Sequence, residues 1–299
     1  MLVKSAGDRG GPAAVALGFT MGTEPIVTIA VPSYQQGRYL EDALTSIVQL
    51  DLPVELFVAD AGSTDGSAEV IRKWANRITS WRSYPDGGQS AAVNECIAKG
   101  RAPYVCWLNS DDRFLPGALI HLIEALERNS SWPAAYGQAW NVSEGSTKTW
   151  PVRVEPFDAH RLALRCIICQ PASLIRREAW EAVGGLDEDL HMAMDYDLWW
   201  RLYHKFGPLG FVEAPIAINR QHLSNKTVSR RREHYAEAIK VVRRHYGRVP
   251  VKWRLAQPYA VWFKRLVAQW KKRRLANQSP LSPGSPIRQR DNANRPTFG

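Results

Sequence analysis

The chain has 299 residues, of which 45% are hydrophobic and 23% are charged, as in an ordinary globular protein with a sizeable core. No stretch approaches the roughly 18 to 20 consecutive apolar residues that a membrane-spanning helix requires. The four cysteines are too few for a disulfide scaffold of this size. The length therefore predicts one large α/β domain or two small ones.

The charge of the chain is unevenly distributed. Residues 1–225 carry 20 Lys and Arg against 26 Asp and Glu, a net charge of −6, whereas residues 226–299 carry 19 against 3, a net charge of +16. A mildly acidic body is thus followed by a strongly basic tail. This asymmetry indicates an anionic surface as a partner.

Strands and helices alternate through the first half of the chain. Residues 1–24 contain an apolar patch that is too short for a signal peptide, so we expect a flexible lead-in. The hydrophobic pattern then predicts strands at 26–31 (closed by Pro32), 54–59, 78–83 and 105–108, with helices at 39–50, around 70–74, up to 98 and from 116. This alternation predicts a mostly parallel sheet, whose ligands bind beyond the carboxyl ends of the strands. Three polar turns fall at such ends: PSYQQG, DAGSTDG and NSDD.

The second half is less regular. We expect a strand near 134–140, a loop through 141–155, a helix at 194–207 that buries Trp199 and Trp200, short strands near 210–219 and a charged helix at 230–246. The lone pair Cys166 and Cys169 has no second Cys or His pair at metal spacing, so we interpret both as core thiols.

A basic aromatic segment follows at residues 252–274. Its apolar residues, including Trp253, Trp262 and Trp270, recur at helical spacing beside Lys and Arg. Such a helix can lie in an anionic membrane interface, or it can pack its apolar stripe on the domain. Residues 275–299 are rich in Pro, Ser, Asn and Arg and are expected to be disordered.

Five motifs in a fixed order resemble the inverting family 2 glycosyltransferases with the GT-A fold. They are VPSY at 31–34, ADAGSTDG at 59–66, PDGGQSAAVN at 85–94, LNSDD at 108–112 and AMDYDLWWRL at 193–202. The resemblance covers about residues 25–225 and implies a Rossmann-like, mostly parallel sheet flanked by helices. It leaves a basic helical extension at 226–274.

The resemblance implies a nucleotide-sugar donor and a set of residues that bind it. Asp60 follows an apolar strand and matches the aspartate that reads the nucleotide base, whereas Asp65 is better explained as a helix N-cap. Asp86 and Gln89 precede a helix N-terminus, where backbone N–H groups suit phosphate. The remaining donor-site candidates are Pro32, Tyr34, Asp111, His222 and Lys226, and Gln170 and Pro171 are candidates for the acceptor side.

The adjacent carboxylates Asp111 and Asp112 match the family's Asp-x-Asp-like metal site. Because the two carboxylates repel each other, a Mg²⁺ or Mn²⁺ ion bound together with the diphosphate would offset the repulsion. Asp112 is the predicted metal ligand, and Ser110 replaces a frequent aspartate. The alternative is an acidic turn that caps the helix after Pro116.

Asp195 matches the family's catalytic base, which takes a proton from the acceptor hydroxyl in a single displacement. Asp197 is the alternative candidate for a helix cap in this motif. Relatives often have Glu where this chain has Met194.

The implied partners are a nucleotide-sugar donor and a glycan or lipid-linked acceptor, and the implied location is cytoplasmic. An anionic membrane surface contacted through 252–274 would make the protein peripheral at the inner face of the plasma membrane. Two alternatives remain. The basic tail could bind nucleic acid, although it has no recognisable reading motif and no nucleic acid is expected, or Ala61 and Ser110 could mark an inactive scaffold.

Overall fold

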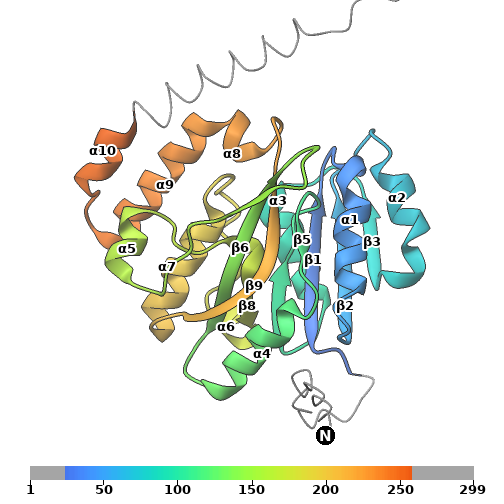
Figure 1. Cartoon of the computed structure of the whole chain (residues 1–299), viewed down its shortest axis with the longest axis horizontal. Coiled ribbons are helices and arrows are strands. Elements are labelled where there is room, and N and C mark those ends of the chain that lie inside the picture. The colour runs from blue at the N-terminus through green and yellow to red at the C-terminus, as the bar shows by residue number, and fades with distance from the viewer. Residues whose placement is uncertain (1–23, 258–299) are drawn as a thin grey trace, which may run out of the picture. The chain divides into compact units, whose positions relative to one another are not determined.

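A computed structural model describes residues 24–257 of the chain (Figure 1). Residues 24–253 belong to one compact unit, and Arg254 begins a second. The predicted flexible lead-in, the disordered tail and most of the basic aromatic segment lie outside the described residues. Of the helices between 24 and 257, none combines the length and apolar character needed to span a bilayer.

Within residues 24–257, nine strands form one mixed sheet in the order β3-β2-β1-β4-β8-β6-β9-β5, with β7 paired to β6. The β1, β2, β3 and β4 pairings are parallel, β8 is antiparallel to β4 and β6, and β9 is parallel to β6. The predicted mostly parallel sheet is therefore confirmed. The strands are β1 Val27–Ser33, β2 Val54–Asp60, β3 Ser80–Ser83, β4 Tyr104–Trp107, β5 Arg113–Phe114, β6 Ala134–Ser143, β7 Thr149–Pro151, β8 Ser173–Arg176 and β9 Gly210–Gln221.

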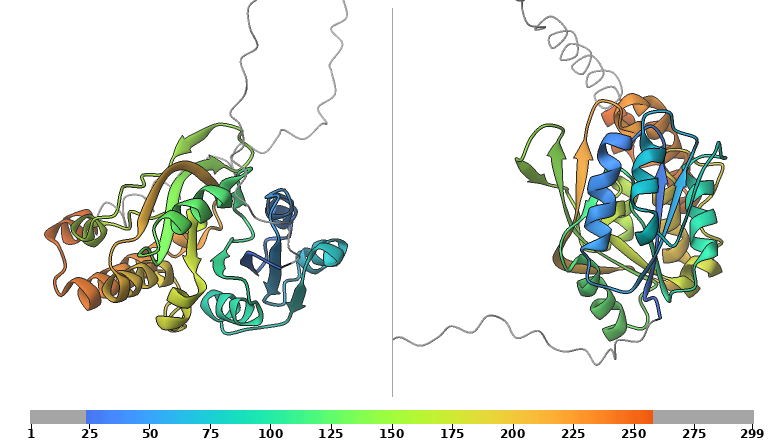
Figure 2. Two further views of the ribbon diagram at one scale, coloured as in Figure 1. Left: turned by 90° about the horizontal axis from the view of Figure 1, so that it is seen from below. Right: turned by 90° about the vertical axis from the view of Figure 1, so that its right-hand side faces the viewer.

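Helices cover both faces of the sheet (Figure 2). One buried cluster joins the sheet to α1, α2 and α4, and the other joins it to α3, α5, α6, α7 and α9. The α-helices are α1 Gly37–Val48, α2 Ser67–Lys73, α3 Gln89–Lys99, α4 Ala118–Arg128, α5 Ala159–Leu164, α6 Arg177–Ala182, α7 Met194–Phe206, α8 Lys226–Ser229, α9 Arg231–Tyr246 and α10 Val251–Gln257, and two short 3₁₀ helices lie at Ala75–Arg77 and Gln170–Ala172. As expected, Trp199 and Trp200 of α7 are fully buried.

Two strand predictions need correction. The first strand does not stop at Pro32, because Pro32 pairs with Ala59 of β2 and the strand continues to Ser33. The missing N–H of Pro32 would face β4, whose pairing with β1 already ends at Ala30, so the proline breaks no ladder bond. The expected short strands near 210–219 are one twelve-residue strand, β9, and the expected loop at 141–155 contains the end of β6 and all of β7.

The charged helix α9 is part of the core. Ala238, Val241 and Val242 are buried in the same cluster as the apolar residues of α7. Trp253 is half-buried, donates its indole N–H to the Ala163 carbonyl oxygen at 2.8 Å and packs edge-on against Tyr235. Trp253 therefore contacts the domain, whereas Trp262 and Trp270 lie outside the described residues.

Candidate active site

The candidate residues lie at the carboxyl ends of the parallel strands, where ligands bind in such sheets. Ser33, Asp60 and Ser83 end β1, β2 and β3 in register. Because β9 runs in the same direction as β6 and β4, its carboxyl end reaches the same edge, and His222 follows it directly. Segments far apart in the sequence thus meet at one edge of the sheet (Figure 1).

Asp60 is fully buried, and its carboxylate is held by three donors. It accepts hydrogen bonds from the Ser63 backbone N–H at 2.9 Å, the Ser63 hydroxyl at 2.5 Å and the Ser83 hydroxyl at 2.6 Å. Because these bonds fix the carboxylate rigidly, Asp60 is a preorganised acceptor. Its role in reading a base remains a prediction.

The first two turns at this edge are tied together. The backbone N–H of Gln35, a residue with φ of 54°, donates to the Ser63 hydroxyl at 2.8 Å. Asp65 accepts from the backbone N–H groups of Gly37 and Ser67 at 2.8 and 3.2 Å, so it fastens the starts of α1 and α2. The N-cap position itself is Gly66, but the structural interpretation of Asp65 agrees with these bonds. Tyr34, in the first turn, is 62% exposed and open to a ligand.

Asp111 and His222 are brought together from opposite parts of the chain. The His222 Nε2 lies 2.9 Å from Asp111 Oδ2, and the Asn225 side-chain amide donates to the same oxygen at 3.2 Å. The other ring nitrogen of His222 contacts the Ser224 hydroxyl at 3.1 Å, which orients the ring. The Asp111 carboxylate and the His222 imidazole are thus held in direct contact at this edge.

Asp112 occupies a different environment. It is buried, and its two oxygens accept from the Arg220 backbone N–H at 2.9 Å and the Asn109 amide at 3.2 Å. Burial first, and the neighbouring Asp111 carboxylate second, raise the pKa of Asp112 well above its ordinary value.

The residues at this edge fit a divalent cation through Asp111 and His222. Mg²⁺ and Mn²⁺ commonly bind through one or two protein ligands together with substrate phosphates, and an imidazole favours a transition metal such as Mn²⁺ over Mg²⁺. Residues 24–257 contain no group of three or more His, Cys, Asp or Glu that could hold an ion alone. A cation here would thus need the substrate diphosphate as a further ligand, and the predicted role of Asp112 as the metal ligand stays a prediction.

The donor-loop candidates form a connected polar network. Asp86 pairs with Arg82 at 2.9 Å and accepts from the Gly88 N–H at 2.8 Å, so it shapes the loop. The Gln89 amide donates to Asn109 at 2.7 Å, and the Lys226 ammonium donates to Gln89 at 3.1 Å. Burial, and secondarily Arg230, lower the pKa of Lys226. The structure thus brings Gln89 and Lys226 together, whereas Asp86 is engaged by Arg82.

Asp195 lies in the first turn of α7, beside this network. The segment before it contacts the donor loop, because Ser90 donates to the Leu190 carbonyl oxygen at 3.0 Å and Lys226 to that of His191 at 3.1 Å. The carboxylate accepts from the Tyr196 backbone N–H at 2.8 Å, and no Lys, Arg or His among the described residues pairs with it. Burial raises its pKa from 3.8 to about 6. A carboxyl poised near neutral pH suits general base catalysis.

Asp197 is not a helix cap. The N-cap of α7 is Ala193, and the fully buried Asp197 carboxylate pairs with Arg201 at 2.6 Å, His245 at 2.7 Å and Arg244 at 3.2 Å. Burial would raise the pKa of Asp197, but the hydrogen bonds from His245 and Arg201 outweigh it and lower the pKa to about 2. The cap prediction fails because the side chain points into the interface with α9.

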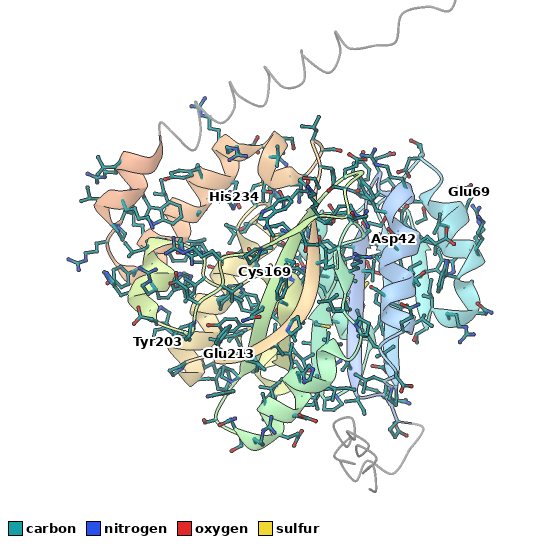
Figure 3. The ribbon with its side chains drawn as sticks, in the orientation of Figure 1. Asp42, Glu69, Cys169, Tyr203, Glu213 and His234 are labelled. Carbon is teal, nitrogen blue, oxygen red and sulfur yellow. The ribbon has the colours of Figure 1, made fainter. Side chains whose placement is uncertain are left out.

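Cys169 is a buried thiol next to Gln170. Burial first, and then the charges of Asp112, Cys166 and Asp195, raise the pKa of the Cys169 thiol. Figure 3 labels Cys169 near the centre of the view. Cys166 and Cys169 are both free thiols. Gln170, next to Cys169, donates to the Trp107 carbonyl oxygen at 2.8 Å and accepts from Asn109 at 3.3 Å, which fixes it beside the NSDD turn.

Sequence reasoning missed three residues that organise this edge. The backbone N–H of Arg220 donates a hydrogen bond to Asp112. Its guanidinium group donates to the Asp111 carbonyl oxygen at 3.1 Å and to the Asp42 carboxylate at 2.7 Å. Figure 3 labels Asp42 on α1. Asn109 and Asn225 complete the contacts of Asp111 and Asp112. The only sequence signal was their position inside the NSDD and NRQHLSNKT segments. The carboxylates that Arg220 and Asn225 contact lie more than 100 residues away, whereas Asn109 contacts Asp112 within the same turn.

Comparison with known proteins agrees with this geometry. The sequence model described as Glycosyl transferase family 2 matches residues 28–184, more than half of the chain. The chain is 27% identical to the chondroitin synthase of Pasteurella multocida (strain Pm70) over 186 residues, covering 60% of this chain and 19% of that protein. For the chondroitin synthase of Escherichia coli the identity is 25% over 242 residues, 78% of this chain and 34% of that protein. The chain thus spans about a fifth to a third of the length of these curated relatives.

Solved structures share the fold. S. aureus TarS 1–349 in complex with UDP-GlcNAc superposes with a TM-score of 0.60 and 15% identity, over 82% of this chain and 73% of that one. The mannosyltransferase PcManGT from Pyrobaculum calidifontis, in complex with GDP-Man and Mn²⁺, superposes with a TM-score of 0.53 and 19% identity, over 86% of this chain and 77% of that one. The predicted GT-A fold is confirmed. With its motifs, its fold and the match over residues 28–184 in agreement, the chain belongs to glycosyl transferase family 2.

Proposed function

We propose that this chain transfers a sugar from a nucleotide-diphosphate sugar to an acceptor hydroxyl, with inversion and with the help of a divalent cation. The observation that carries the proposal is Asp195, a half-buried carboxyl with a pKa of about 6 and no cationic partner in the described chain. It lies beside a sheet edge that gathers the preorganised Asp60 and the Asp111–His222 pair. An inactive scaffold would not need an unpaired carboxyl at this position.

Asp195 would act as the general base. As the acceptor oxygen attacks the anomeric carbon, the bond to the nucleoside diphosphate breaks on the opposite face, and the hydroxyl proton passes to the Asp195 carboxylate. A single displacement needs neither a nucleophilic residue nor a second catalytic carboxylate. The configuration at the anomeric carbon is therefore inverted.

The remaining residues would hold the donor. Asp60 would accept a hydrogen bond from the base, while Gln89 and Lys226 would contact the donor from the facing loops. Asp111 and His222 would hold Mn²⁺ or Mg²⁺, which supplies positive charge to the diphosphate as negative charge builds on its oxygens. Asp112 would stabilise this turn through the hydrogen bonds that it accepts from Arg220 and Asn109.

The names of similar proteins support a sugar-nucleotide donor and a carbohydrate acceptor. TarS is described with UDP-GlcNAc, PcManGT with GDP-Man, and two relatives as chondroitin synthases. We therefore propose a UDP- or GDP-sugar as the donor and a growing glycan or a lipid-linked sugar as the acceptor.

The decisive assay measures release of nucleoside diphosphate from UDP-GlcNAc, UDP-glucose, GDP-mannose and dTDP-glucose, with Mn²⁺, Mg²⁺ or EDTA. We expect metal-dependent turnover of at least one donor and its loss in Asp195→Asn. Wild-type protein that neither turns over a donor nor binds a nucleotide in a metal-dependent manner would overturn the proposal.

We further propose that the enzyme associates with the anionic inner face of the plasma membrane. The exposed residues Arg232, Lys240 and Arg243 share one face of α9, and no carboxylate within residues 24–257 lies within 4.0 Å of them. Each Lys or Arg close to an anionic membrane surface contributes about 1 kcal/mol to the free energy of membrane binding.

Co-sedimentation with vesicles of phosphatidylcholine and phosphatidylglycerol tests this association. Substitution of all three α9 residues by Glu should weaken binding to the vesicles. The control substitutes Arg72, Lys73 and Arg77, in and just after α2, by Glu; it changes the net charge by the same amount and should leave binding unchanged. Equal loss in both variants would show that only net charge matters, and binding that neither variant affects would refute a role for α9.

A further inference from the structure

Helix α9 contacts the polypeptide on both sides of Asp195. Glu237, near the middle of α9, binds the backbone just before Asp195, and His245, near its end, binds Asp197 just after it. The family match ends at residue 184, so the match does not account for these contacts.

The Glu237 carboxylate binds three consecutive backbone N–H groups. It accepts from the N–H groups of His191 at 3.2 Å, Met192 at 2.7 Å and Ala193 at 3.0 Å. Successive N–H groups that point at one spot form an anion-binding concavity. A single carboxylate thereby fixes three consecutive peptide units, the last of which belongs to the N-cap of α7.

The second contact holds the other side of the first turn. Asp197 is fully buried and pairs with His245 and Arg244 of α9 as well as with Arg201 of its own helix. The ring of His245 also stacks on Trp200, with an angle of 5° between the planes. The first turn of α7 is thus attached to α9 at two points that bracket Asp195.

The orientation of Asp195 depends on this turn. Its recorded hydrogen bond is to the backbone N–H of the next residue, Tyr196, so its direction follows the backbone of α7. A base displaced by about 1 Å can lose about a hundredfold in rate. Any element that fixes this backbone therefore fixes the base.

We propose that Glu237 is the positioning residue for Asp195 and that α9 is the element through which this chain aligns its base. This inference rests on the proposed role of Asp195. Packing alone would need only the apolar face of α9, made by Ala238, Val241 and Val242. It would not need a half-buried carboxylate whose two oxygens both face the backbone of residues 191–193.

The test compares Glu237→Ala and Glu237→Gln with a matched control, Glu233→Ala. Glu233 is an exposed carboxylate one turn earlier on the same helix and pairs only with Arg230. With the best donor of the panel above, we expect Glu237→Ala to lower kcat about 10- to 100-fold and to change the donor KM less than twofold. Glu237→Gln keeps one acceptor oxygen and should recover part of kcat, and Glu233→Ala should match wild type.

A double variant separates positioning from general destabilisation. If Glu237 acts through Asp195, then adding Glu237→Ala to Asp195→Asn should not lower the residual rate further, because residues that act as a unit are not additive. Additive losses would overturn the proposal, as would a raised donor KM with unchanged kcat or full activity of Glu237→Ala. Thermal unfolding and binding of UDP with Mn²⁺ confirm that each variant is folded.

The same panel distinguishes the two levels of inference. Full activity of Asp195→Asn would refute the proposed base and the positioning role together. An inactive Asp195→Asn beside a fully active Glu237→Ala would refute the positioning role alone.

Discussion

The pKa of Asp195 predicts the pH dependence of the enzyme. The base must be ionised to accept a proton, so kcat/KM should rise with pH through the pKa of Asp195 in the free enzyme and then reach a plateau. Burial places that pKa at about 6 instead of 3.8. At pH 5 about one-tenth of the carboxyl is ionised if the pKa is 6, whereas more than nine-tenths would be ionised at the ordinary value.

The assay is nucleoside diphosphate release measured as kcat/KM between pH 4.5 and 8.5 at saturating Mn²⁺. We expect kcat/KM at pH 5 to be about a tenth of the plateau. If kcat/KM at pH 5 is still near its plateau value, the base is not a buried carboxyl with a raised pKa.

Loss of bound metal at low pH would produce a similar limb, because protons compete with a metal ion for its ligands. The two origins respond differently to metal. A limb caused by loss of metal should move to lower pH as the Mn²⁺ concentration rises. A limb caused by Asp195 should stay in place, and one that moves would contradict our reasoning.

Three further outcomes are expected. Asp111→Asn should lower Mn²⁺-dependent turnover about a hundredfold or more and weaken the apparent Mn²⁺ affinity in a metal titration; unchanged affinity would favour Asp112 as the ligand. Asp60→Asn should lower stability by about 1–3 kcal/mol, because its amide N–H would face the donors of Ser63 and Ser83, and should weaken UDP binding in calorimetry; wild-type affinity would exclude Asp60 from the nucleotide site. Asp197→Asn should cost about 3 kcal/mol or more, because it removes the ion pairs that a fully buried carboxylate makes with Arg201 and Arg244. Denaturant unfolding should show this cost above pH 4 and a smaller one as the pH falls toward 2, since a carboxyl with a lowered pKa loses its contribution there; a constant difference across that range would contradict the ion pairing.

The fold was accessible from the sequence because its signals are local. β-branched runs alternate with amphipathic helices, and polar turns follow the strands, so the parallel core and its carboxyl edge could be predicted. The end of β1 was misplaced because the tolerance of Pro32 depends on where the neighbouring strand β4 ends. Pairing of this kind is a tertiary property that a local pattern does not encode.

The candidate site was accessible in part. The motifs suggest Asp60, the NSDD turn and Asp195 as candidates, and the structure brings Gln89, Lys226, Asp111 and His222 to one edge. The sequence pattern predicts Asp112 as the metal ligand, whereas we propose Asp111 together with His222. The difference arises from the Arg220 backbone N–H, which binds one carboxylate, and from His222, which faces the other.

Asp195 and Asp197 illustrate how the same residue type acquires opposite properties within one helical turn. Asp195 has only backbone donors, so burial dominates and its pKa is raised to about 6. Asp197 is more deeply buried, yet the hydrogen bonds from His245 and Arg201 outweigh that burial and lower its pKa to about 2. A raised pKa favours the protonated folded state, so the contribution of Asp195 to stability is lost as the pH rises through 6, whereas that of Asp197 is retained above pH 4. At neutral pH α9 therefore stabilises, through Asp197, the same turn that carries an ionised and destabilising Asp195. Strain of that kind is expected at a catalytic base, and it requires an external support such as α9.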